Sequence, residues 1–328
     1  MAVRTIEYRQ LAYIIFMFMI VQFTGLLLAS QIFSGATYSM MASAQISSNY
    51  IGSLFYIAFV IVFGIFILLL FRLYKGAAIY ALLDAVVVIS ASFVFFLIIV
   101  SSLSGSAFNA LFGTGAPIQL FAVAIVLACA LAYAKFRIPR LRNVTAMVAS
   151  VGVGVLLGVS FGFFAALTFM VVLAVYDFVA VFITKHMIAL GNMAVENNLS
   201  LMIMASEVEA IPLTQLSKAE RREYSKSKKE TAKQGGLFRS LMGENMVPVA
   251  ARTALGTGDL AVPLMIAVSA YKVYLSFTLS FVVVLGAILG LAITMLVLKR
   301  YRRALPAIPF LLFGIAIALL LFFLASIL

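Results

Sequence analysis

Long uninterrupted apolar runs are the feature that most limits what this chain can fold into. A helix of about 20 apolar residues is needed to cross the hydrocarbon core of a bilayer, which is about 30 Å thick. Of the 328 residues, 65% are hydrophobic and only 10% are charged, whereas about a quarter of a soluble domain is charged. The sequence therefore excludes a water-soluble globular domain and predicts an all-α integral membrane protein.

Nine such runs can be recognised along the chain, and the fifth and sixth are separated by only a few residues around Gly162. Residues 191–245 are polar and rich in charge, which predicts a flexible cytoplasmic loop. We therefore expect an N-terminal bundle of six transmembrane helices over 1–190, the loop, and three C-terminal transmembrane helices over 246–328. The predicted spans are 11–33, 51–71, 79–103, 117–134, 144–160, 163–184, 246–270, 273–298 and 306–327.

The distribution of basic residues supports this helix count, because Lys and Arg gather in the cytoplasmic loops of membrane proteins. With the N-terminus in the cytoplasm, nine spans put every one of the 23 Lys and Arg residues except Lys272 on the cytoplasmic side. The outer segments 34–50 and 104–116 carry no charged residue. This alternation predicts a cytoplasmic N-terminus and an external C-terminus, and we expect Lys272 to extend to the outer surface.

The net charge of +12 has the same explanation. Basic loops and acidic lipid surfaces attract one another, so we expect a lipid bilayer and not nucleic acid as the partner of these charges. We expect no metal and no cofactor, because the single Cys129 and the single His186 cannot build a Cys- or His-based site alone.

Three aspartates lie within or beside apolar runs, where a charged group costs about 2.5–3.5 kcal/mol on insertion scales. Asp84 is close in sequence to Arg72 and Lys75, which predicts an interfacial ion pair. Asp177 and Asp259 lie deeper within their runs and are candidate functional residues.

Asp177 and Asp259 lie on consecutive spans that run in opposite directions. Lys185 follows Asp177 by eight residues, and Arg252 precedes Asp259 by seven, and each basic residue marks the cytoplasmic end of its span. A helical rise of 1.5 Å per residue then gives both aspartates a depth of ~10–12 Å from the same face. We therefore expect the two carboxyl groups to meet.

The residues around Asp259 favour an open, wet helix at this depth. Gly256 and Gly258 weaken the helix, and Pro263 removes the backbone donor that would bond to the carbonyl of Asp259. Such backbone is tolerated in a membrane beside protein or a water-filled cavity. Two adjacent carboxyls that share one proton can hydrolyse a peptide bond. A proton- or cation-coupled transporter uses the same kind of buried acids, and the residues alone leave both functions open.

Glycine spacing indicates where helices pack closely. Gly154, Gly158 and Gly162 repeat every fourth residue, as do Gly286 and Gly290. Small residues at this spacing let helix backbones approach each other in lipid.

Three short motifs, in this order and with a long loop between the first two, resemble those of the presenilin and signal peptide peptidase family of intramembrane aspartyl proteases. The family motifs are Tyr-Asp, Gly-x-Gly-Asp and Pro-Ala-Leu, and the resemblance is strongest to presenilin and its archaeal homologues. The matching residues are Tyr176-Asp177, Gly256-Thr257-Gly258-Asp259 and Pro306-Ala307-Ile308.

The resemblance implies a presenilin-like fold of nine helices in the cell membrane of a prokaryote, with transmembrane-helix proteins as substrates. It implies that Asp177 and Asp259 are catalytic and that the other motif residues support the site or bind substrate. Assembly into a homo-oligomer stays open. Two residues depart from the family pattern: Ile308 replaces a leucine, and Leu260 stands where presenilins usually carry an aromatic residue, which predicts an altered substrate preference.

Overall fold

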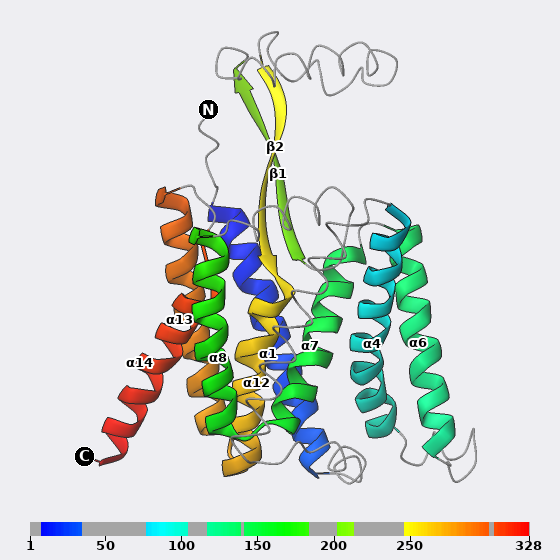
Figure 1. Ribbon diagram of the computed structural model, residues 1–328, viewed down its shortest axis with the longest axis vertical. Helices are drawn as coiled ribbons and strands as arrows, with labels where there is room; N and C mark the ends of the chain where they lie inside the picture. Colours follow the sequence, from blue (N-terminus) through cyan, green and yellow to red (C-terminus); the bar gives the residue numbers. More distant parts are fainter. Residues whose placement is uncertain are drawn as a thin grey trace. The chain divides into compact units, whose positions relative to one another are not determined.

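The computed structural model describes residues 8–34, 77–103, 117–138, 141–183, 202–212, 246–301 and 305–327, which are mostly helical (Figure 1). The helices are α1 (Tyr8–Ser34), α4 (Ala77–Leu103), α6 (Pro117–Arg137), α7 (Arg142–Ser160), α8 (Phe163–Phe178), the π-helical segment η2 (Val179–Ile183), α12 (Thr257–Tyr274), α13 (Phe277–Tyr301) and α14 (Ile308–Ile327). The strands are β1 (Met202–Pro212) and β2 (Met246–Gly256), which pair in a two-stranded sheet.

The chain divides into two compact units. One comprises residues 1–14 and 204–254 and contains most of the β1–β2 sheet. The other comprises residues 15–203 and 255–328 and contains the helical bundle together with all three motifs.

Seven of the described helices are long and apolar enough to cross a membrane. They are α1, α4, α6, α7, α8 with η2, α13 and α14. Each coincides with a predicted span, because the run of apolar side chains needed to cross lipid has about the same length as the helix that carries it. The predicted span 51–71 lies outside the described residues.

The predicted break between the fifth and sixth spans is confirmed at two residues. Phe161 (ψ 150°) directly follows α7 and Gly162 (ψ 158°) directly precedes α8, and both have extended backbone. No atom lies within 4 Å of the position that a Cβ on Gly162 would take. Gly162 therefore joins two helices, and the prediction that it packs against a neighbouring helix is wrong.

The predicted span 246–270 is wrong at its start. Residues 246–256 form strand β2, and the helix α12 begins at Thr257 and ends at Tyr274. The all-α prediction is accordingly wrong for this stretch and for β1, which is the only part of the predicted loop 191–245 that the structure describes. The depth of Asp259 estimated from Arg252 assumed a helix, whereas a strand rises about 3.3 Å per residue, so that estimate is also wrong.

Helix α12 is enclosed by its neighbours. It packs against α7, α8 and α13, as Figure 1 shows near the middle of the bundle, and every residue from Leu260 to Ala270 is buried. A helix that is apolar on all sides is typically buried. Because Asp259 and Lys272 lie near its two ends, α12 is less apolar than the seven helices above.

Close packing at the other four predicted glycines is confirmed. A Cβ on Gly154 would lie 2.9 Å from the carbonyl oxygen of Ala261 on α12, and Gly158 meets the same helix one turn further on. Gly286 and Gly290 of α13 face the backbone of α14 in the same way. The glycines thus let α7 approach α12, and α13 approach α14, with the backbones almost in contact.

Candidate active site

Asp177 lies in the last turn of α8, where the helix changes its geometry. Its side chain is 6% exposed. The α-helix ends at Phe178, and the next five residues, Val179–Ile183, form the π-helical segment η2. Single π-helical turns are rare within α-helices and are frequent at functional sites. Asp177 is therefore a buried acid beside irregular backbone.

The backbone at the start of α14 faces this carboxyl. The Ile308 N–H donates a hydrogen bond to Asp177 Oδ2 at 3.4 Å, and the amide of Ala307 faces the same carboxyl. Residues 305–307 are not helical, and Pro306, Ala307 and Ile308 are buried. These amides are available because the first N–H groups of a helix have no partner within the helix.

Asp259 is the third residue of α12. Gly256 before the helix is extended (ψ 146°), and the carboxyl of Asp259 turns back toward the Gly256 amide. A Cβ on Gly256 would lie 3.2 Å from Asp259 Oδ2, so glycine leaves room for this fold-back. An acid at the third position commonly bonds to the amide of the residue that caps the helix, and the helix dipole favours negative charge there.

The structure brings Asp177, Asp259 and the Ile308 amide into one region. The carboxyls of Asp177 and Asp259 are close enough for their charges to interact. Asp177 lies at the end of α8 and Asp259 at the start of α12. Helix α8 contacts both α12 and α14, which brings the three motifs together although up to 131 residues separate them.

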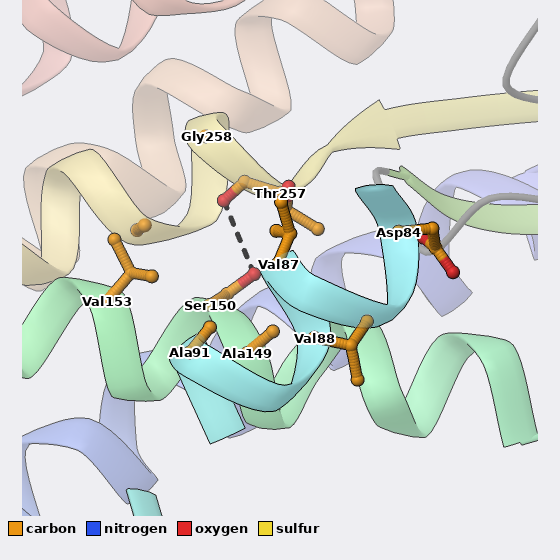
Figure 2. Close-up of a pocket in the computed structure, with 10 residues that line it drawn as sticks. Asp84, Val87, Val88, Ala91, Ala149, Ser150, Val153, Thr257 and Gly258 are labelled. Carbon is orange, nitrogen blue, oxygen red and sulfur yellow. Dashed lines mark hydrogen bonds between the residues drawn. The ribbon is translucent and has the colours of Figure 1, made fainter. Parts of the chain in front are cut away.

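The supporting residues predicted from the sequence lie around this region. Tyr176 is partly exposed, beside the buried Asp177. Thr257 and Gly258 border a cavity of about 140 Å³ that is also lined by α4 and α7. Figure 2 shows Asp84 at the right of the residues that line it, with Thr257 between Asp84 and Val153. Most of the lining side chains are apolar, and neither Asp177 nor Asp259 is among them.

Comparisons with known proteins indicate the family to which the chain belongs. The sequence profile of the family described as signal-peptide peptidase, presenilin aspartyl protease matches residues 15–328. The chain belongs to this family. Among curated proteins, none matches the chain significantly.

Solved structures have the same fold. A presenilin family intramembrane aspartate protease in space group C222 has a TM-score of 0.55 and 20% identity over 95% of this chain and 99% of its own. A second structure described in the same words, in space group P2, has a TM-score of 0.55 and 21% identity over 94% of each chain. This protein of the presenilin and signal peptide peptidase family is therefore a multi-pass membrane protein and an intramembrane aspartyl protease. Of the two functions that the residues left open, the family match supports the protease.

One departure from the family pattern lies inside the fold. Leu260, which replaces an aromatic residue of presenilins, has no exposed surface. Its side chain does not line an open surface, so an effect on substrate preference would have to act through the packing of α12.

The structure gives partners for two charged residues that were singled out from the sequence. Asp84 forms an ion pair with Lys135 of α6, and both side chains are buried. Arg72 and Lys75, the partners predicted from the sequence, lie outside the described residues. Lys272, predicted to extend to the outer surface, is partly exposed and donates a hydrogen bond to the Val159 carbonyl at 2.7 Å. A lysine at this point satisfies a carbonyl at the C-terminal end of α7.

Two polar residues near Asp259 were not singled out from the sequence. Gln22 of α1 and Ser150 of α7 are buried and donate hydrogen bonds to backbone carbonyls on either side of Asp259. Gln22 could have been found, since an amide in the middle of an apolar span must bond to another helix. Ser150 could not, because serines are common in such spans and usually bond to their own helix.

Proposed function

We propose that Asp177 and Asp259 form a catalytic pair that uses water to cleave peptide bonds of transmembrane helices. The observation that carries the proposal is the convergence of both carboxyls with the Ile308 amide at the meeting point of α8, α12 and α14. Two acids whose charges interact in a poorly solvated region share one proton, because ionising both of them is unfavourable.

The ionised member of the pair takes a proton from the attacking water as its oxygen bonds to the scissile carbonyl carbon. The protonated member donates a hydrogen bond to the carbonyl oxygen, and the departing amine receives a proton when the C–N bond breaks. The pair titrates as one unit, so the acid role is assigned to neither residue. The Ile308 amide holds the Asp177 carboxyl in one orientation.

Residues 305–308 are proposed to bind the substrate, with Pro306, Ala307 and Ile308 beside the scissile bond. A helical amide is shielded by its own turn, so the substrate must unwind locally. Non-helical backbone next to Asp177 offers carbonyl groups to an extended strand, and Pro306 has no N–H that would compete. Tyr176, Gly256, Thr257 and Gly258 shape the pocket and support the two acids.

Water reaches the pair through hydrated space in the bundle. Gly256, Gly258 and Pro263 support this, since loosened backbone within a membrane requires such a space or enclosing protein.

The proposed topology has nine spans with a cytoplasmic N-terminus and an external C-terminus, as the alternation of basic and uncharged segments indicates. The substrate would be a helix running from outside to inside, cut near its cytoplasmic end. The proposed location is the cell membrane of a prokaryote, with residues 191–245 as a cytoplasmic loop between the six N-terminal and three C-terminal helices.

The experiment that tests the proposal uses purified protein and a single-span substrate. Asp177→Ala and Asp259→Ala should each abolish cleavage while the protein stays folded. Ser280→Ala is the control, because it removes a buried donor of α13 that bonds to the Ala267 carbonyl, away from both carboxyls, and it should still cleave. Cleavage by either Asp177→Ala or Asp259→Ala at the parent rate would overturn the proposal.

A further inference from the structure

Gln22 connects the first helix to the backbone beside Asp259. Its Nε2 donates a hydrogen bond of 2.9 Å to the carbonyl oxygen of Leu260, which is 238 positions later in the chain. Gln22 has no exposed surface. One turn further along α1, Gly25 meets the side chain of Leu264. One face of α1 therefore holds the first two turns of α12.

Ser150 of α7 makes a second contact with the start of α12. Its Oγ lies 3.3 Å from the carbonyl oxygen of Thr257 and 2.7 Å from that of Ala146 in its own helix. The hydroxyl has a single hydrogen, which the two carbonyls share. The bond to Thr257 is drawn in Figure 2. Ser150 and Gly154 are four residues apart, so the bond and the close helix contact lie on one face of α7.

The first turn of α12 is weakly held by its own helix. Gly256 and Gly258 leave the backbone a wide choice of conformations. Pro263 lies inside α12 and lacks the N–H that would bond to the carbonyl of Asp259. The two outside donors bind Thr257, two residues before Asp259, and Leu260, directly after it.

We infer that Gln22 and Ser150 are positioning residues that hold the Asp259 carboxyl at the height and orientation at which it meets Asp177. This inference rests on the proposed function. Neither side chain touches the reacting groups; each acts through a backbone carbonyl. Helix carbonyls can accept these bonds because each has two lone pairs. A misplacement of a catalytic group by ~1 Å costs about a hundredfold in rate.

The test compares variants of the full chain with a single-span substrate in purified form. Gln22→Met and Ser150→Ala keep the approximate volume and lose the donor. The control is Ser280→Ala, because Ser280 donates a buried 2.9 Å bond from α13 to the Ala267 carbonyl of α12, well away from the turn. We expect kcat to fall by about ten- to a hundredfold in the first two variants with KM unchanged, and to stay near the parent value in the control.

Ser150→Thr is the conservative variant. It keeps the hydroxyl, and the cavity that borders Ser150 has room for the added methyl group. We expect it to cleave at close to the parent rate, which a role in packing alone would not predict. If Gln22→Met is not recovered as folded protein, the comparison of Ser150→Ala with Ser150→Thr decides the question.

The outcomes separate this inference from the proposed function. Parent kcat in Ser150→Ala overturns the inference, and so does an equal loss of kcat in Ser280→Ala. Either result leaves the catalytic pair standing as long as Asp177→Ala and Asp259→Ala are inactive. Cleavage by those two variants overturns the proposed function itself.

Discussion

The Ile308 N–H donates a hydrogen bond to Asp177 Oδ2 across 131 positions of sequence. Ile308 is the first residue of α14 and Asp177 lies in the last turn of α8. The bond therefore joins a free amide at the start of one helix to an acid at the end of another. It gives the Pro306-Ala307-Ile308 motif a direct contact with a proposed catalytic group.

Replacing Ile308 by proline removes this donor with little cost to the helix, because proline is well tolerated at the first helical position. A hydrogen bond to a charged group contributes about 1.5–3 kcal/mol, and this bond of 3.4 Å belongs at the lower end because normal N–H···O bonds are shorter. We therefore expect Ile308→Pro to lower kcat by roughly tenfold. Steady-state cleavage of a single-span substrate measures the effect. Ile308→Leu is the control, since it keeps the amide and restores the usual residue of the family. Equal rates for the two variants would show that the amide has no role.

Cleavage should depend on pH in a bell-shaped manner. At low pH both Asp177 and Asp259 are protonated, so no carboxylate can take the proton of water. At high pH both are ionised, so no acid polarises the carbonyl. We expect the optimum at or somewhat below neutral, measured as kcat in detergent over a range of buffers. A rate that still rises above about pH 9 would contradict one shared proton.

The helices of the bundle could be predicted from the sequence, because the bilayer sets the length of an apolar run and every backbone group must bond within its own helix. The two aspartate motifs could also be found, because Asp177 and Asp259 are charged residues within apolar runs. The strand Met246–Gly256 could not. It is mostly apolar and runs directly into α12, and its partner β1 lies in a distant and otherwise polar segment, so the local sequence does not indicate the pairing.

The partners of buried polar groups could not be predicted either. The sequence indicates the depth of Asp84 but not the helix that it faces, and the structure pairs it with Lys135, which was expected in a loop. The same is true of Gln22 and Leu260. Which helices become neighbours depends on close packing at positions such as Gly154. The spacing of the glycines predicts a face that packs closely, but it does not indicate which helix packs there.

The contact of α7 with α12 should be sensitive to one methyl group. A Cβ on Gly154 would lie 2.9 Å from the backbone oxygen of Ala261, which cannot move without shifting α12. We expect Gly154→Ala to destabilise the fold by about 1–3 kcal/mol, measured as a lower melting temperature in detergent, and to slow cleavage because Asp259 moves with its helix.

Gly162→Ala is the matched control on the same row of glycines. No atom lies within 4 Å of the added Cβ, and φ of −78° suits alanine, so we expect no loss of stability and a gain of up to about 1 kcal/mol from a less flexible unfolded chain. A melting temperature that falls equally in both variants would contradict the assigned packing.

Losing one member of the buried pair Asp84 and Lys135 should destabilise the fold more than losing both. Removing one member breaks a buried ion pair, which costs about 3–5 kcal/mol, whereas replacing both by uncharged groups is often near neutral. Arg142 is close enough to Lys135 for their charges to interact, so Asp84→Asn leaves two like charges together. We therefore expect Asp84→Asn and Lys135→Met each to lower the melting temperature and the double variant to regain most of the loss. Additive losses in the double variant would show that the two residues do not stabilise the fold as a pair.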